Sequence, residues 1–378
     1  MAGEMSLEQL LREMCEKGAS DLHIKVGSPP GLRIDGKIEP HSEMGKLTPE
    51  MTETYVREIT NENQWMDYCS TGDLDFGHSI SGLARFRVNV MRQRGSCGLV
   101  IRKIPVDIPT IEDLKLPEVC RELAEKPRGL VLVTGPTGSG KSTTLAALID
   151  HVNRTESGHI LTMEDPIEFI HTDKKCYINQ REIGSDTMTF NAGLKRALRQ
   201  DPDVILIGEL RDLETISLAV SAAETGHLVF ATLHTTSAIQ TVDRLIDVFS
   251  PDQQEQIRMQ LSITLQGVIS QCLLSKIGGG RVAAHEIMIA TGAVRASIRE
   301  GKTAQMQNIL TTGSRYGMVT LEDSLAKLAK SGTITPETAV AKANNPEMVR
   351  RALNLPETDR RGAGAEQTSV MAGQVIGR

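Results

Sequence analysis

The sequence lacks an excess of positive charge, paired cysteines and any apolar run long enough to span a membrane. The formal net charge over 378 residues is −6, whereas a nucleic-acid motor usually presents a basic face, so the charge argues weakly against a nucleic-acid partner. A basic channel inside a ring would still be compatible with this charge. No signal-peptide segment opens the sequence, and we expect any membrane contact to come through partner proteins.

Cysteine is present but scattered. None of the six cysteines forms a C-x-x-C pair, and they occupy positions 15, 69, 97, 120, 176 and 272. This spacing is typical neither of a disulfide framework nor of a zinc site. We therefore interpret the cysteines as reduced thiols of a cytosolic protein.

The stretch GPTGSGKSTT, residues 135–144, matches the phosphate-binding pattern G-x-x-x-x-G-K-[ST]. It follows an apolar, β-branched segment that predicts a buried strand, and it precedes a segment with helical apolar spacing. In this context backbone N–H groups surround the phosphates, Lys141 reaches the β- and γ-phosphates, and Ser142 binds Mg²⁺. The residues predicted to hold ATP are Gly135, Pro136, Thr137, Gly138, Ser139, Gly140, Lys141, Ser142 and Thr143.

A second predicted strand, at 159–163, is followed by the carboxylates Glu164 and Asp165. Ligands of open α/β sheets bind at the carboxyl ends of the strands. We therefore predict Glu164 as the general base that activates the attacking water, with Asp165 supporting either Glu164 or the metal. The alternative is an acidic turn before Pro166.

A third predicted strand, at 203–207, ends at Gly208 and Glu209. In many P-loop enzymes an acidic residue at this place holds Mg²⁺ through water. We predict that Glu209 reaches the metal shell and that Gly208 lets the backbone approach the phosphates. A solvated carboxylate at the end of the strand is the alternative.

Histidines stand at both ends of a fourth predicted strand, at 228–233. We predict that His227 meets the γ-phosphate or couples its loss to movement. His234 stands at the other end, next to two threonines that could bond with it. A satisfied polar group is the usual role of a lone histidine on a strand, and this alternative applies to both residues.

Arginines could stabilise the charge of the transferred phosphate through their planar guanidinium groups. Arg85, Arg87 and Arg102 lie on predicted strands of the N-terminal region. If this region closed over a nucleotide, Arg87 or Arg102 could act as an arginine finger. Arg196 and Arg199 are predicted to share one helix face. Surface salt bridges are the alternative for each of them.

The pattern along the chain predicts two folded domains. Alternating segments at 21–26, 31–36, 83–90 and 98–104, with helices at 5–17 and about 48–67, predict a small α+β domain. Apolar strands alternating with helices then predict an α/β domain with a parallel sheet. The predicted division is 1–105, a connector at 106–127, 128–290, a helical segment at 291–355, and a disordered tail at 356–378.

Several stretches together resemble the type IV pilus retraction ATPases of the secretion ATPase superfamily, and the similarity covers roughly residues 5–330. They correspond to the Walker A, Asp box, atypical Walker B and His box motifs, with flanking sequence. The stretches are 19–23, 83–89, 129–144, 160–169, 198–203, 209–216 and 222–235.

This resemblance implies a homohexameric ring whose subunits pair a PAS-like N-terminal domain with a RecA-like ATPase domain. It also implies that ATP lies between the two domains and is completed by N-terminal arginines. Hydrolysis would then act on an inner-membrane platform protein at the cytoplasmic base of the pilus. The extra N-terminal domain and tetracysteine insert usual in extension motors and type II secretion ATPases are not expected.

One motif departs from the family. The retraction branch carries A-I-R-N-L-I-R, whereas residues 293–299 read AVRASIR, so that Ala296 and Ser297 replace asparagine and leucine. This difference fits a paralogous or accessory retraction motor, and an amphipathic helix with no dedicated role is the alternative for the segment. Three alternatives to the retraction motor itself stay open. They are an accessory retraction ATPase, a type II secretion-like ATPase, and a nucleotide-gated regulatory subunit with little turnover.

Overall fold

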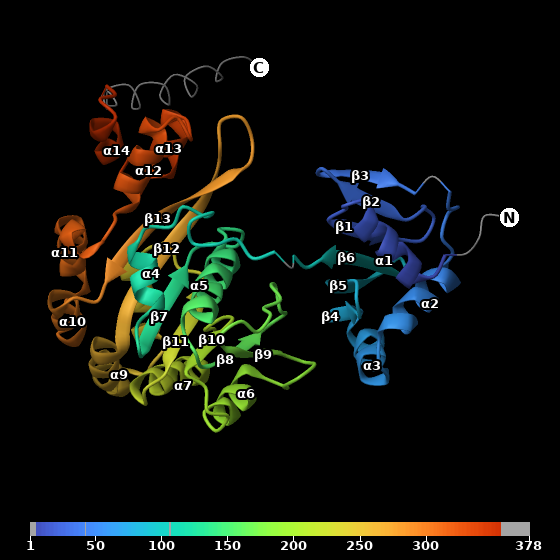
Figure 1. Cartoon of the computed structure of the whole chain (residues 1–378), viewed down its shortest axis with the longest axis horizontal. Coiled ribbons are helices and arrows are strands. Elements are labelled where there is room, and N and C mark those ends of the chain that lie inside the picture. Colours follow the sequence, from blue (N-terminus) through green and yellow to red (C-terminus); the bar gives the residue numbers. More distant parts are fainter. Residues whose placement is uncertain (1–4, 42, 106, 357–378) are drawn as a thin grey trace, which may run out of the picture.

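The computed structural model describes residues 5–41, 43–105 and 107–356, which form an N-terminal α+β part and a larger α/β part (Figure 1). A chain of helices follows the second sheet. This is the predicted fold class, an α/β domain with a mostly parallel sheet that is preceded by a small α+β domain and followed by a helical segment. The predicted tail at 356–378 lies, apart from its first residue, outside the described residues.

The N-terminal sheet is antiparallel, with strand order β3-β2-β1-β6-β5-β4. Leucines of the first helix pack into its core, and a capping box of Ser6 and Gln9 begins that helix as predicted. The elements are α1 Leu7–Glu16, β1 Asp21–Ile24, β2 Gly31–Ile34, β3 Lys37–Pro40, α2 Pro49–Ile59, α3 Glu62–Thr71, β4 Asp73–Ile80, β5 Ala84–Gln93 and β6 Ser96–Lys103.

Two features of this sheet differ from the sequence prediction. The helical stretch predicted at 48–67 is two helices, because Thr60 leaves the helical backbone conformation and Asn61 caps α3 in a box with Gln64. The edge strands β3 and β4 were not predicted. All residues of β3 are exposed, so no alternation marks it, and β4 loses its alternation at Gly77.

The larger sheet has the strand order β13-β12-β7-β11-β10-β8-β9, and β13 is its antiparallel strand. The four predicted strands are confirmed as β7, β8, β10 and β11, whereas β9, β12 and β13 were missed. The elements are α4 Val119–Ala124, β7 Gly129–Thr134, α5 Lys141–Thr155, β8 His159–Glu164, β9 Tyr177–Glu182, α6 Phe190–Ala197, β10 Val204–Ile207, α7 Leu213–Glu224, β11 Leu228–Leu233, α8 Ala238–Asp247, α9 Pro251–Thr264, β12 Leu265–Ser275 and β13 Arg281–Ile289.

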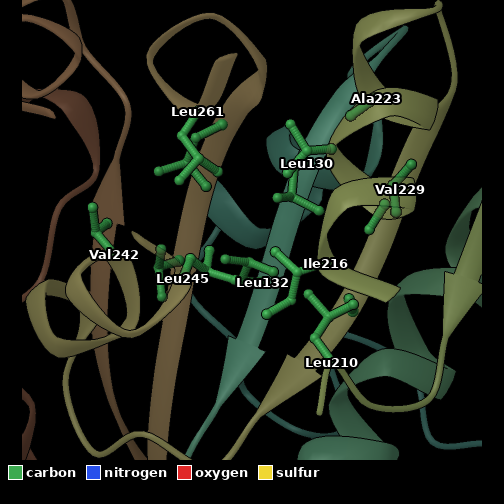
Figure 2. Packing of buried hydrophobic residues seen from close by; sticks show 14 of the residues in the cluster. Leu130, Leu132, Leu210, Ile216, Ala223, Val229, Val242, Leu245 and Leu261 are labelled. Carbon is green, nitrogen blue, oxygen red and sulfur yellow. The ribbon is translucent and has the colours of Figure 1, made fainter. Parts of the chain in front are cut away.

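Hydrophobic cores lie on both faces of this sheet. Successive residues of β7 alternate between them, so that Leu130 and Leu132 pack with α7, α8 and α9, and Val131 and Val133 pack with α4 and α5. Figure 2 shows the first of these cores. The second core also includes residues between 111 and 124, so this part of the predicted connector packs on the sheet. The domain boundaries themselves stay predictions.

The segment after residue 290 is helical, as predicted. Leu321 and Leu325 are buried and Leu328 is half-buried, so the predicted leucine face packs inward. Among the described residues, no helix is both long and apolar enough to cross a membrane. The helices are α10 Gly292–Arg299, α11 Met306–Thr312, α12 Leu321–Lys330, α13 Pro336–Lys342 and α14 Pro346–Ala352, with short 3₁₀ turns at Thr303–Gln305 and Ser314–Tyr316.

Candidate nucleotide-binding site

The glycine-rich loop connects β7 to α5, as the motif requires. A Cβ on Gly135, whose φ is +143°, would lie 2.2 Å from the carbonyl oxygen of Gln271 and 2.6 Å from Ser139 Oγ. Only glycine therefore fits where β12 passes behind the loop. Gly140, with φ +88°, is the N-cap of α5, and the exposed N–H groups of the first helical turn follow it. The loop is thus shaped to receive an anion at a helix N-terminus.

Gln271, on the unpredicted strand β12, fixes the loop from behind. Its buried side chain donates from Nε2 to the carbonyl oxygen of Ser139 at 2.7 Å and accepts from Thr144 Oγ1 at 2.9 Å. No motif marks this glutamine, and only its place beside β7 brings it to the loop. The hydroxyl of Ser139 is buried with no hydrogen-bond partner. A buried donor of this kind fits a phosphate oxygen as its partner.

Lys141 begins α5 and folds over the loop. Its Nζ donates to the carbonyl oxygen of Gly135 at 2.8 Å and to that of Pro136 at 3.2 Å. Burial lowers the pKa of Lys141, and the nearby carboxylates of Glu209 and Glu168 act in the opposite direction. The ammonium group therefore stands at the loop, with carboxylates close enough to favour its charged form.

Glu164 lies at the carboxyl end of β8 and lines the same cavity as the loop. Its Oε1 accepts from Thr162 Oγ1 at 2.6 Å and from Gln180 Nε2 at 3.2 Å. Burial raises the pKa of Glu164, and these two hydrogen bonds oppose that rise. A carboxylate with a raised pKa, held in a fixed orientation beside a phosphate-binding loop, is suited to accept a proton from water. Asp165 lines the cavity and is exposed.

Glu209 follows β10 and is half-buried in the cavity. Its carboxylate contacts Arg211 Nη2 at 2.9 Å and His234 Nε2 at 3.3 Å. A Cβ at Gly208 would lie 3.3 Å from Glu164 Cα and from the carbonyl oxygen of Met163, and the predicted approach of this backbone to the phosphates stays a prediction. The parallel pairing of β8 with β10 brings Glu164 and Glu209 to the same edge of the sheet.

The structure corrects the prediction for His227. Strand β11 is parallel to β7 with Leu228 opposite Gly129, so His227 lies at the opposite end of the sheet from the loop. Six strand residues separate the two ends, which is roughly 20 Å. The ring of His227 instead contacts the carbonyl oxygen of Ala222 at 2.9 Å. Of the two predicted histidines, His234, at the carboxyl end of β11, is the one that lines the cavity.

Of the four arginines predicted to take part in catalysis, two line the cavity and two do not. Arg87 and Arg102 line the cavity from the N-terminal domain, where Arg102 Nε lies 2.7 Å from Asp21 Oδ1. Arg196 and Arg199 do not line it, and they do not share a helix face, because α6 ends at Ala197. Within this chain they stand apart from the loop.

The oxygen donors fit a magnesium ion. Ser142 and Glu209 both line the cavity, and Mg²⁺ prefers one or two protein oxygens together with water and phosphate. Within the described ranges, no group of three or more His, Cys, Asp or Glu side chains could hold a metal by itself. This donor set suits a metal that arrives with a nucleotide.

Comparison with known proteins gives consistent matches. Residues 3–279 match the profile of the family described as type II/IV secretion system protein, which is more than half of the chain. The chain belongs to this family.

Members named for pilus retraction are among its relatives. The chain is 51% identical over 343 residues to the type IV pilus retraction ATPase PilT of Pseudomonas aeruginosa, covering 91% of this chain and 99% of that protein. It is 50% identical over 319 residues to a twitching motility protein of Neisseria gonorrhoeae, covering 84% and 85%. A crystal structure of the pilus retraction motor PilT with bound ADP superposes with a TM-score of 0.86 at 47% identity, covering 92% of this chain and all of that one.

The motif that departs from the retraction branch forms α10 in this family member. Arg295 donates to the carbonyl oxygens of Ser262 and Ile263, at 2.8 and 2.7 Å, and so caps the C-terminal end of α9. Ser297, which stands where the branch has leucine, is 5% exposed. Arg299 is exposed. The two motif arginines thus have different surroundings, one within the fold and one on its surface.

Proposed function

We propose that the protein is an ATP-hydrolysing motor that retracts type IV pili. One observation carries the proposal. Glu164, Glu209 and His234 line the same cavity as the loop at 135–144, at one edge of the sheet. The identity of 51% over nearly the whole length of a pilus retraction ATPase supports the cellular role.

The chain's own residues divide the work of hydrolysis. The loop N–H groups, Lys141 and the N-terminus of α5 hold the phosphates and balance their charge. Ser142 and Glu209 would hold Mg²⁺, which when bound supplies positive charge to the phosphate oxygens. Glu164 orients the attacking water and accepts its proton. His234 bonds to Glu209 and faces the same space, so it can stabilise that carboxylate or the γ-phosphate.

The N-terminal arginines complete the proposed site. Arg87 and Arg102 reach the cavity from a different domain than the loop, which suits residues that respond to domain closure. We expect either Arg87→Ala or Arg102→Ala to slow turnover by tenfold or more, roughly, without abolishing nucleotide binding, because arginine fingers act mainly on the transition state. Unchanged turnover in both variants would remove this role.

The proposal also covers how the subunits assemble and where in the cell they act. The subunits form a homohexamer, and the ring acts on an inner-membrane platform protein at the cytoplasmic base of the pilus. The likeness to the retraction motor over the full length of its chain supports this arrangement. We expect no nucleic-acid partner, and the net charge of −6 is weak support for this expectation.

The experiment that tests the function uses Lys141→Ala in the native gene. We expect abundant surface pili and no twitching motility, because extension continues while retraction stops. Bald cells would assign the motor to extension and overturn the proposal. Unchanged pili and motility would point to a motor for another secretion machine or to a redundant paralogue, and deletion of the paralogue separates these two.

A second candidate is an accessory retraction ATPase or a regulatory subunit with little turnover, and Ser297 in a buried position of α10 favours it. Glu164→Gln distinguishes a motor from a regulatory subunit. In a motor it keeps ATP binding and lowers turnover by about two orders of magnitude or more, which is the range for loss of a general base. A purified wild type that hydrolyses ATP no faster than Glu164→Gln would favour the regulatory subunit.

A further inference from the structure

A buried carboxylate of the larger sheet bonds to the N-terminal sheet. Strand β4 is an edge of the N-terminal sheet and β9 is an edge of the larger sheet. Glu182 of β9 accepts from the backbone N–H of Gly77 at 2.7 Å and from Arg85 Nη2 at 2.6 Å. Glu182 is only 1% exposed. The edge N–H of β4 and a guanidinium of β5 thus both bind a side chain of the other domain.

The same carboxylate also holds the loop that follows Glu164. Glu182 Oε2 accepts from the backbone N–H of Ile167 at 3.1 Å. In the register of β8 with β9, Glu182 is opposite Glu164 itself. Glu182 therefore bonds at once to the N-terminal domain and to the segment that leaves the candidate base.

Gln180 stands two residues earlier on the same face of β9 and orients the base directly. Its Nε2 donates to Glu164 Oε1 at 3.2 Å and to the carbonyl oxygen of Phe169 at 2.8 Å. Its Oε1 accepts from the backbone N–H of His171 at 2.8 Å. Both polar groups of the amide are thus used, so the direction of its N–H toward Glu164 is fixed.

A buried carboxylate needs its partners. If the N-terminal domain moved away, Arg85 and Gly77 would leave Glu182 with the N–H of Ile167 alone. Once the N-terminal domain no longer covers it, Glu182 would bond to water in place of Arg85 and Gly77, and the edge strand β9 would lose its contact with β4 and become freer to shift. A shift of β9 moves Gln180, which lies on the same strand.

We infer that β9 couples the position of the N-terminal domain to the orientation of Glu164, with Glu182 as the contact to that domain and Gln180 as the positioning residue. The inference rests on the proposed role of Glu164 in hydrolysis. Turnover is then fast while Arg85 and Gly77 are hydrogen-bonded to Glu182, and it slows when these bonds break.

Gly77→Ala is a direct test of this coupling. A Cβ at Gly77 would lie 2.4 Å from Arg85 Nη2 and 2.7 Å from both oxygens of Glu182, while its φ is not in the left-handed region. The substitution therefore blocks the contact without straining the strand. Gly98→Ala is the matched control, since Gly98 lies in the same sheet and its added Cβ would approach nothing closer than 3.5 Å.

We expect Gly77→Ala to lower kcat for ATP about fivefold or more in the full-length protein, with KM changed less than about twofold, since the ground-state site is untouched. Gly98→Ala should keep wild-type kcat. Arg85→Ala should reproduce the loss and Arg85→Lys should restore part of it, because lysine can still donate to Glu182. If Gly77→Ala does not fold, the two Arg85 variants test the coupling in its place.

The decisive comparison is a double-mutant cycle with Gln180→Ala. If the signal passes through Gln180, then Gly77→Ala lowers kcat little further in the Gln180→Ala background. If the fold-losses in kcat of the two single variants simply multiply in the double variant, the coupling is overturned. Normal turnover in Gly77→Ala and Arg85→Ala, with an inactive Glu164→Gln, would overturn it too and leave the proposed function standing. An active Glu164→Gln would overturn the role of Glu164 and the coupling together.

Discussion

Gln271 offers the sharpest test of how the phosphate-binding loop is held. Its side chain bridges the carbonyl oxygen of Ser139 in the loop and the hydroxyl of Thr144 in the first turns of α5. Gln271→Leu removes both hydrogen bonds and keeps a side chain of similar length. Both former partners lie in buried residues.

The free-energy cost of Gln271→Leu follows from the loss of these two hydrogen bonds. Each hydrogen bond contributes about 1 kcal/mol net, and a buried group left without its partner costs about 1–3 kcal/mol. Thr144 can turn its hydroxyl toward a carbonyl of its own helix, which offsets part of the loss. The total is about 2–4 kcal/mol. If about 2 kcal/mol of this total destabilises the loop conformation that binds nucleotide, the Kd for nucleotide rises by about thirtyfold.

Isothermal titration with ADP measures this effect without turnover. Gln266→Leu is the matched control, because it lies on the same strand and its side chain donates to Arg128 rather than to the loop. We expect a clear rise in Kd for Gln271→Leu and no more than about a twofold change for the control. A Gln271→Leu protein that melts as a folded protein and binds ADP like wild type would refute the reasoning.

Three further outcomes are expected. Because burial raises the pKa of Glu164 above the ordinary value for glutamate and the base must be ionised, kcat should fall as the pH drops through that raised pKa. A pH–kcat profile without this acid limb would contradict it. His234→Ala should slow steady-state turnover about tenfold or more, whereas His227→Ala should change it less than about twofold. Arg295→Ala should destabilise the fold by about 2–3 kcal/mol, seen as a lower melting temperature, because the last carbonyls of α9 lose a charged donor.

Much of the site could be predicted because its signals are local. The spacing of Gly135, Gly140 and Lys141 requires neighbours only a few residues apart, and the strand and helix on either side are marked by their own periodicity. Glu164 and Glu209 were predicted to share one edge because the carboxyl ends of parallel strands meet there, and the register confirms that β8 and β10 are neighbours.

The errors share a physical cause. His227 and His234 stand at the two ends of one strand, and the sequence does not show which end faces the loop unless strand direction is followed from β7 to β11. Arg199 was placed on a helix that stops at Ala197, because the composition of the helix end resembles its interior. Edge strands such as β9 were missed since an edge has no continuous apolar run to mark it.

The sequence by itself determined the phosphate-binding loop, the two carboxylates and the parallel sheet that carries them, because each depends on residue type and short-range order. Only the tertiary structure decided which distant groups complete the site. Gln271 reaches the loop from a strand 130 residues away, roughly, and Glu182 binds Gly77 and Arg85 across two sheets. Such contacts depend on which strands become neighbours, and that is set by the packing of whole sheets.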